Sequence, residues 1–216
     1  MATIPGGITS RPSGKVGNIV FGAARTPEGK VATARQLVTP SNPDTPAQQQ
    51  QRGKFDQSLS IVQNIGPGIY QDDWNRAVGQ LPGFQSWMSV LLNNIDNNDV
   101  LQPPPTRPLG DLYLQDGDPT LGSPAAGSIG ASYATSAGSN GTGSDVAVLV
   151  GIEAAQPGGG GERHVDVETS RDRSDGSAAV TGFPSGVDVV TAFYFRGQGT
   201  ADGLLSNAVF GVATTQ

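Results

Sequence analysis

Seven short β-prone segments, separated by turn clusters, occupy the C-terminal half of the chain and restrict its fold more than any other feature. They lie at 109–114, 128–134, 145–153, 164–168, 177–183, 187–195 and 206–213. Glycine and proline supply 31 and 16 of the 216 residues, which agrees with many turns between short strands. Seven strands in roughly 100 residues are typical of an immunoglobulin-like sandwich.

The order of the last segments supports this interpretation. Phe183, Pro184 and Gly186 precede the 187–195 run, and a glycine loop then leads to the final segment. This order resembles the last strands of a fibronectin type III domain, in which a leucine-proline-glycine-x-tyrosine corner precedes a strand. Asp188 stands near the place of the family's tyrosine, so the corner matches in outline only.

Residues 41–96 have the pattern of a small helical region. Thr45 suits an N-cap, Pro46 the first helical position and Gln48 the capping-box position. The four glutamines that start at Gln48 are good helix formers and belong to the first turns of a helix. The expected apolar stripe of this helix is formed by Phe55, Leu59 and Val62.

Two further helices are expected in this region. Gly66-Pro67-Gly68 ends the first helix, a second fits residues 71–80, and a third fits 84–95, where apolar residues keep helical spacing. Trp74 and Trp87 lie in the last two helices and form either a small shared core or a partner-binding surface. Three short helices bury little area, so we expect support from a neighbouring domain or subunit.

Residues 97–108 have the composition of a linker. Three consecutive prolines at 103–105 favour a stiff polyproline II segment. We expect this segment to hold the two halves of the chain at a fixed distance.

Residues 1–40 have the pattern of an extended arm. A β-prone run at 16–23 and an alternating run at 30–38 flank a turn that contains Pro27 and Gly29, which predicts a β-hairpin. An isolated hairpin is barely stable in water. We therefore expect the arm to lie on another part of the protein or on another chain.

Charge is unevenly distributed along the chain. Residues 1–54 carry seven basic and two acidic side chains (+5), and the remainder carries six basic and 17 acidic ones (−11), which together give −6. Unless this asymmetry is chance, a basic arm on an acidic body indicates a charged partner. An acidic neighbouring subunit fits better than nucleic acid, because no aromatic residues are interleaved with the basic ones to stack bases.

The composition excludes some classes of protein. The chain has no cysteine, so it has no disulfide and no thiolate metal site. No run reaches the roughly 20 apolar residues of a membrane span. The first residues lack the pattern of a secretory signal, so we expect synthesis in a cytoplasm.

No motif indicates catalysis. His164 is the only histidine, and no Ser-His-Asp arrangement follows from its surroundings in sequence. The glycines at 158–161 lack the Lys-Ser/Thr of a phosphate loop and fit a flexible hairpin tip. The Arg-Asp-Arg run at 171–173 fits a charged hairpin turn better than a recognition site.

Two further patterns have an ordinary explanation beside a functional one. Asp111, Asp116 and Asp118 could ligate calcium, but the fuller calcium-loop pattern is missing, and an ordinary turn explains them. Asn140 begins an Asn-Gly-Thr sequon, although Asn-Gly is also a preferred tight turn. We therefore expect no metal, cofactor or active site.

A pattern of residues runs through roughly positions 10–90. It consists of Ser13-x-x-x-Gly17, a β stretch ending near Arg35, Asn42-Pro43-x-Thr45-x-Ala47-Gln48-x-x-x-Arg52-x-x-Phe55, and Trp74. This pattern resembles uncharacterised phage and prophage virion proteins, in which a glycine-rich hairpin leads to the same motif. Gly66-Pro67-Gly68 alters the family's spacing between tryptophans. The resemblance implies a virion component and no catalytic residues.

The expected fold class is mainly β with a small α-helical segment. An extended arm with a β-hairpin (1–40) leads to two or three short helices (41–96). A Pro-rich linker (97–108) then precedes a C-terminal immunoglobulin-like β-sandwich (109–216).

The expected function is that of a non-enzymatic structural protein of a phage-like virion, associated with its capsid or tail. Its partners are further copies of itself and other virion proteins, without a membrane span, direct nucleic-acid contact or cofactor. The residues expected at the assembly interface are Arg11, Lys15, Val16, Ile19, Phe21, Arg25, Arg35, Arg52, Phe55, Trp74 and Trp87. The alternative is a module or adhesin that binds a host-surface glycan or protein. Its candidate aromatic contacts are Tyr113, Tyr133 and Tyr194.

Overall fold

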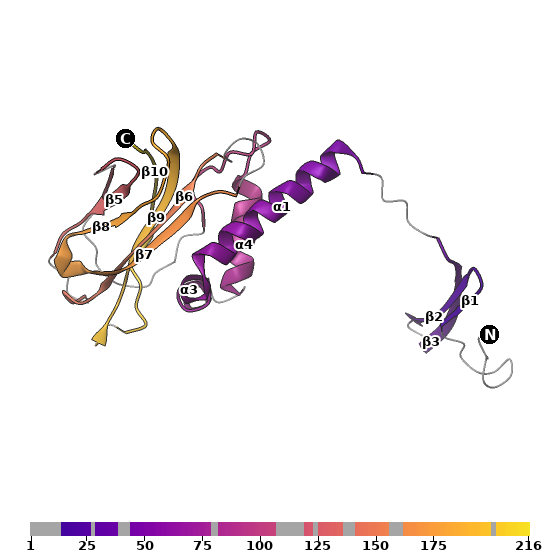
Figure 1. Cartoon of the computed structure of the whole chain (residues 1–216). Helices are drawn as coiled ribbons and strands as arrows, with labels where there is room; N and C mark the ends of the chain where they lie inside the picture. The colour runs from indigo at the N-terminus through magenta and orange to yellow at the C-terminus, as the bar shows by residue number, and fades with distance from the viewer. Residues whose placement is uncertain are drawn as a thin grey trace. The chain divides into compact units, whose positions relative to one another are not determined.

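The computed structural model of the chain contains two compact units, Met1–Thr45 and Pro46–Gln216, which we call the arm and the body (Figure 1). The structure describes the following residues: 14–26, 29–38, 44–78, 82–106, 119–122, 125–135, 141–155, 162–199 and 202–216. Each unit is considered by itself below.

The arm is a three-stranded antiparallel sheet. Its strands are β1 (Gly14–Val16), β2 (Ile19–Thr26) and β3 (Gly29–Gln36), in the order β1-β2-β3. The β2–β3 pair confirms the predicted hairpin, and β1 adds a strand that the sequence did not indicate. Gly17 makes the tight turn between β1 and β2 with φ 59°, a left-handed conformation that glycine adopts without strain.

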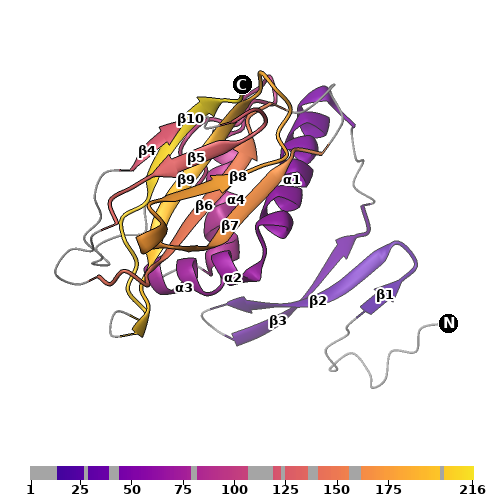
Figure 2. The same cartoon turned by 60° about the vertical axis from the view of Figure 1, so that its left-hand side comes forward.

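Two antiparallel sheets form a sandwich in the body. The first has the order β4-β5-β8 and the second β10-β9-β6-β7 (Figure 2). The strands are β4 (Thr120–Gly122), β5 (Ile129–Ser132), β6 (Val146–Glu153), β7 (Val165–Asp172), β8 (Ser177–Val180), β9 (Asp188–Arg196) and β10 (Val209–Thr214). Compared with an antibody constant domain, the fourth of these strands pairs with the third instead of the fifth. The mainly β fold class with a small helical part is confirmed.

The helices are α1 (Pro46–Ile65), α2 (Pro67–Tyr70), α3 (Asp73–Val78) and α4 (Gly83–Asn94). The predicted start of α1 at Pro46 and its end before Gly66 are confirmed. Residues 71–80 were expected to be one helix, but the structure has two short ones, α2 and α3, in 67–78. The four glutamines lie in the first turns of α1, as predicted.

The central layer of the body is the four-stranded sheet, and both of its faces are buried. On β6, Val148 and Val150 face the helices, whereas Ala147 and Leu149 face the three-stranded sheet. Strand β9 divides its side chains in the same way, so β6 and β9 contribute to two separate cores. The body therefore has three layers: helices, central sheet and outer sheet (Figure 2).

This layering corrects the expected division of the chain at a stiff linker. The helices belong to the same compact unit as the sandwich, because α1 and α4 fill one core together with β6 and β9. Within the expected linker, Leu101 is buried in that core and its amide donates to the Ala154 carbonyl at 2.6 Å. The described part of the linker, 97–106, is thus packed against the body and does not separate two halves.

Candidate functional site

The pairing of the arm strands assigns side chains to its two faces. Lys15 lies opposite Val20, and Val20 lies opposite Arg35, so these three form one row across the sheet. Residues directly opposite one another share a face, and neighbours along a strand alternate. Ile19 and Phe21 therefore lie on the other face. Among the arm side chains that the structure describes, Lys15 and Arg35 thus share one face, and Ile19 and Phe21 share the other.

Several apolar side chains of the arm are exposed. Ile19 is 46% exposed, Leu37 is 38% exposed and Val38 is 71% exposed, and Phe21 is partly exposed. None of the arm residues that the structure describes belongs to a buried core that could cover these side chains. The arm is consequently the part of the chain whose described surface is best suited to bind another surface.

The predicted interface residues fall into three groups. Lys15, Ile19, Phe21 and Arg35 lie on the arm and are at least partly exposed. Only the backbone of Val16 and Arg25 is described, in β1 and β2, and Arg11 lies outside the described residues. The remaining predicted interface residues, Arg52, Phe55, Trp74 and Trp87, belong to the body.

The two tryptophans are corrections to the expected interface. Trp74 and Trp87 have no exposed surface, and their rings contact one another with centroids 5.0 Å apart. Trp74 also packs edge-on against Tyr194 of the central sheet. They form the core between helices and sheet, the first of the two roles considered for them. A fully buried ring has no surface to offer a partner.

The predicted apolar stripe of α1 is also corrected. Phe55 was expected in it, but Phe55 is 48% exposed, whereas Ser58, Ile61 and Val62 are buried. The buried stripe begins only at Ser58, because the first turns of α1 extend beyond the sheet (Figure 1). Phe55, like Arg52, therefore remains on the surface of the body.

A buried carboxylate joins the helices to the central sheet. Asp73 of α3 accepts hydrogen bonds from the Tyr194 hydroxyl and from Arg196 Nε and Nη2 at 2.9 and 2.7 Å. Burial and then the Asp73 carboxylate raise the pKa of Tyr194 well above its ordinary value. Burial by itself would lower the pKa of Arg196, but the hydrogen bonds and charge of Asp73 outweigh it and raise this pKa. We call this group the Asp73 clasp.

Another buried arginine closes the same interface at the far end of the sheet. Arg163 donates to the Glu153 carbonyl at 3.0 Å, to the Ala154 and Asp99 carbonyls, and to Gln57 Oε1 of α1 at 3.0 Å. It thereby connects α1, the segment after α4 and the end of β6. Three of these four acceptors are backbone oxygens, so this cluster is structural.

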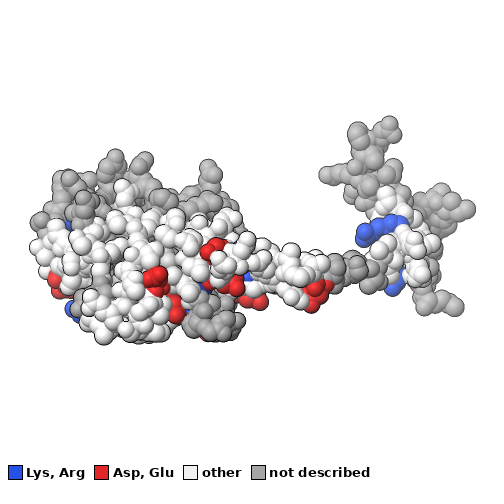
Figure 3. Space-filling model, turned by 90° about the horizontal axis from the view of Figure 1, so that it is seen from above, with Lys and Arg blue, Asp and Glu red and all other residues white. Residues whose placement is uncertain are grey.

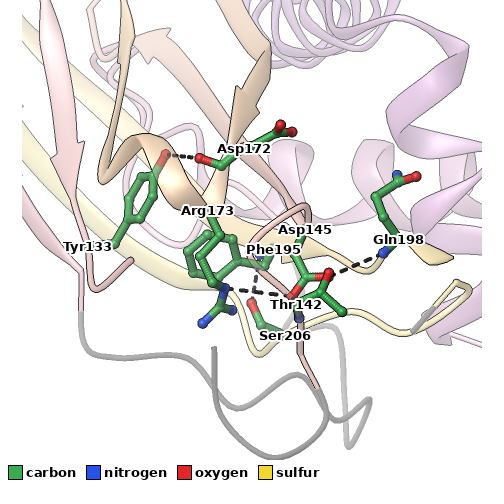
Figure 4. Close-up of polar contacts among 8 residues, drawn as sticks. All are labelled: Tyr133, Thr142, Asp145, Asp172, Arg173, Phe195, Gln198 and Ser206. Carbon is green, nitrogen blue, oxygen red and sulfur yellow. Dashed lines mark hydrogen bonds and ion pairs between the residues drawn. The ribbon is translucent and has the colours of Figure 1, made fainter. Parts of the chain in front are cut away.

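A third polar cluster lies at one end of the sandwich (Figure 4). Asp145 and Arg173 are both fully buried, with Arg173 Nε 3.7 Å from Asp145 Oδ2, and the guanidinium carbon lies 3.7 Å above the Phe195 ring. Asp145 also accepts from Thr142 N at 2.8 Å and from Gln198 N at 3.3 Å. The predicted charged hairpin turn at 171–173 thus contains an arginine that is buried in the fold.

A hollow of about 750 Å³ lies over the outer face of the three-stranded sheet, beside β7. Its floor is made of small side chains, represented by Ser132, Ser177 and Ala179. Its charged lining residues are Asp166, Glu168, Arg171 and Asp175, which together carry a net charge of −2. We call this feature the acidic hollow.

The carboxylates of the acidic hollow are held in place by hydrogen bonds. Asp166 Oδ2 accepts from Thr181 N at 2.8 Å, and Glu168 Oε1 accepts from the amide and hydroxyl of Ser170, both at 2.6 Å. Burial would raise the pKa of Glu168, but the bonds from Ser170 and the nearby Arg171 outweigh it and lower this pKa. Glu168 is therefore ionised at neutral pH.

The other predicted candidates give no chemical site. His164 Nε2 lies 2.9 Å from the Thr181 carbonyl, and its ring packs edge-on against Phe183. Asp111, Asp116, Asp118, Asn140 and residues 158–161 lie outside the described residues. Within the described ranges, no group of three or more His, Asp and Glu side chains is arranged to hold a metal ion. None of the described helices has the length and apolar character needed to cross a membrane.

Sequence reasoning did not identify the Asp73 clasp or the acidic hollow. Asp73 and Arg196 are 123 residues apart, and no local pattern connects them. For the hollow a partial signal existed, since Asp166 and Glu168 alternate along one strand and therefore share a face. The small residues of its floor carry no signal until the strands are paired.

Comparison with known proteins adds no identification. A scan against protein-family models finds no match to the chain, and a search of curated proteins finds no similar sequence.

Proposed function

We propose that the protein is a non-enzymatic structural subunit of a phage-like particle, associated with its capsid or tail. In this proposal the arm docks on a neighbouring subunit, and the body packs within the assembly. The observation that carries the proposal is the exposure of Ile19, Leu37 and Val38 on a unit of which no described residue belongs to a buried core.

The energetics of the arm support a docking role. Fully burying a Val, Leu or Ile side chain is worth about 1.5–3 kcal/mol, so three such residues provide several kcal/mol on docking. A three-stranded sheet needs a covered hydrophobic face for independent stability. A second surface that covers the Ile19 and Phe21 face would supply this missing layer.

The assignment to a virion rests on the resemblance of residues 10–90 to phage proteins. The motif residues Thr45, Ala47 and Gln48 coincide with the start of α1, where the arm meets the body. The proposed location is the virion, after synthesis in a host cytoplasm.

The alternative, a host-surface binding module, receives less support. Its candidate aromatic contacts would have to be exposed on the sandwich, but Tyr194 is fully buried and Tyr133 is buried. Tyr113 lies outside the described residues. Among the described residues that line the acidic hollow none is aromatic, so a sugar ring would find no stacking partner there.

Light scattering tests the proposal. The full chain should form an oligomer or larger assembly, whereas a chain that starts at Pro46 should be a monomer, since Pro46–Gln216 has its own cores. Val38→Asp in the full chain should weaken assembly. Val212→Asp is the matched control, because Val212 is 49% exposed but lies on the body. A monomeric full chain would refute the proposal.

A further inference from the structure

We propose that the acidic hollow is the docking site for the arm of a second copy of this chain. This inference rests on the proposed arm-mediated assembly and names its partner and its site. The arm would lie over the three-stranded sheet with the face that carries Lys15 and Arg35 turned towards the carboxylates.

The arm and the body carry opposite net charges. Residues 1–45 carry five basic and two acidic side chains (+3), whereas residues 46–216 carry eight basic and 17 acidic ones (−9), in agreement with the total of −6. Figure 3 shows Lys and Arg on the arm and patches of Asp and Glu on the body. Complementary potentials of this kind steer association and fix its register.

The spacing of the charged groups also fits. Lys15 and Arg35 are separated by one strand, Val20 standing between them, so their backbones lie roughly 10 Å apart. Asp166 and Glu168 lie two residues apart on β7, about 7 Å along the strand. The basic pair is thus spaced slightly more widely than the acidic pair. Both basic side chains are long and flexible and can compensate for this difference in spacing. Two ion pairs can therefore form at once.

The floor of the hollow is shaped for another layer of backbone. A sheet face that only meets water usually carries long polar side chains. The outward residues of this sheet are small, including Gly130 and Ser132 on β5 and Ser177 and Ala179 on β8. Short side chains let the strands of an incoming sheet approach closely. A further subunit of the assembly then covers the other face of the docked arm, which carries Ile19 and Phe21.

Chain geometry favours a second copy over the arm of the same chain. Helix α1 contacts Arg163 through Gln57. The eleven residues of α1 that precede Gln57 extend about 16 Å from there to Pro46. Glu168 lies on β7, about 17 Å beyond Arg163 along the strand. The ten residues 36–45 span at most about 35 Å, so the chain's own arm would reach the hollow only when fully extended.

Cross-linking between single-cysteine chains tests the site, and the absence of native cysteine makes the result unambiguous. Thr33 is exposed and lies on the face of Arg35, whereas its neighbour Ala34 is exposed on the opposite face. A mixture of Thr33→Cys and Ser177→Cys full-length chains should form a dimer with a short thiol cross-linker. The matched mixture of Ala34→Cys and Ser177→Cys should not.

Charge reversal provides a second, independent measurement. Lys15→Glu with Arg35→Glu should weaken self-association at least about tenfold, and so should Glu168→Lys. Combining the three changes in one chain should restore part of the lost affinity, because one of the two ion pairs can form again with reversed charges. Asp202→Lys, an equal change on an exposed residue outside the hollow, is the control and should have little effect.

Each outcome separates the two proposals. Assembly could require the arm although Thr33→Cys and Ser177→Cys chains do not cross-link and Glu168→Lys has no effect. In that case the arm docks elsewhere, and only this inference fails. Two other results would also overturn it. One is that Ala34→Cys cross-links to Ser177→Cys as well as Thr33→Cys does. The other is that a chain carrying both Thr33→Cys and Ser177→Cys forms the cross-link only within itself. If the full chain is a monomer, the proposed function itself fails.

Discussion

The Asp73 clasp provides a sharp test of how the helices are held on the central sheet. Asp73→Ala removes the acceptor of three hydrogen bonds, one from the Tyr194 hydroxyl and two from Arg196. Both partners would stay in place because β9 is the central strand between β6 and β10. The substitution therefore leaves polar groups without their acceptor at an apolar interface.

The size of the effect follows from the exposure of each partner. Tyr194 is fully buried, and a buried hydroxyl left without an acceptor costs about 1–3 kcal/mol. The side chain of Arg196 is 26% exposed and regains part of its hydration, so the loss of its ion pair adds about 1 kcal/mol. We expect the free energy of unfolding to fall by about 3 kcal/mol, a large share of the roughly 5–15 kcal/mol of a typical domain.

Urea unfolding followed by tryptophan fluorescence measures this effect directly, since Trp74 and Trp87 lie in the same core. Asp56→Ala, at an exposed position inside α1, is the control and should change stability by less than about 0.5 kcal/mol. Tyr194→Phe keeps the Asp73–Arg196 pair and should cost about 1 kcal/mol. The reasoning is wrong if Asp73→Ala costs no more than Asp56→Ala.

Three further predictions concern the body. Gly83→Ala should lower the free energy of unfolding by about 3 kcal/mol, because the added methyl would overlap the Tyr70 carbonyl oxygen, whereas Gly68→Ala meets open space and serves as the control in thermal melts. Burial raises the pKa of Tyr133 to about 12, so the folded state favours the neutral phenol. The free energy of unfolding should therefore fall as pH rises from about 10 to about 12. Denaturant titrations should show a smaller fall for Tyr133→Phe. Deleting residues 1–45 should leave tryptophan emission unchanged, and a shift would contradict the burial of both tryptophans in the body.

Local signals predicted most of the individual elements, but they missed β4, and the expected strand at 109–114 lies outside the described residues. Pro46 and the glycine after Ile65 mark the two ends of α1, and turn clusters separate the strands of the sandwich. These features depend on residues that are close in sequence, which propensity and capping rules describe. The arm hairpin was predictable for the same reason, since the alternation at 30–38 and the turn before it are local.

The layering of the body was not predicted, although a signal for it was present. Residues 146–152 and 189–195 are almost continuously apolar, which indicates strands buried on both faces instead of one. The prediction treated them as ordinary sandwich strands, so the helices were left without a surface to cover. Which helix covers which strand depends on contacts between residues about 100 positions apart, and no local rule supplies these.

For the candidate site too, local features were predictable from the sequence and long-range ones were not. The basic residues and the apolar residues of the arm were predicted from sequence, because an isolated hairpin is a local unit. Helical spacing gave Trp74, Trp87 and Phe55 an apolar position but did not separate a core from an interface, and only packing shows which of them are buried. The acidic hollow requires the pairing of β5 with β8 and the position of β7 beside them, which no single segment encodes.

The shared central sheet also determines when the body can fold during synthesis. Helix α4 ends at Asn94, but its packing partners β6 and β9 begin only at Val146 and Asp188. At roughly 5–20 residues per second, the ribosome needs several seconds between these points. During this interval the apolar faces of α1 and α4 have no sheet to cover, and contacts so distant in sequence form slowly. The body can therefore fold only after almost the whole chain has been synthesised. Until then the uncovered apolar faces of α1 and α4 make the nascent chain prone to aggregation.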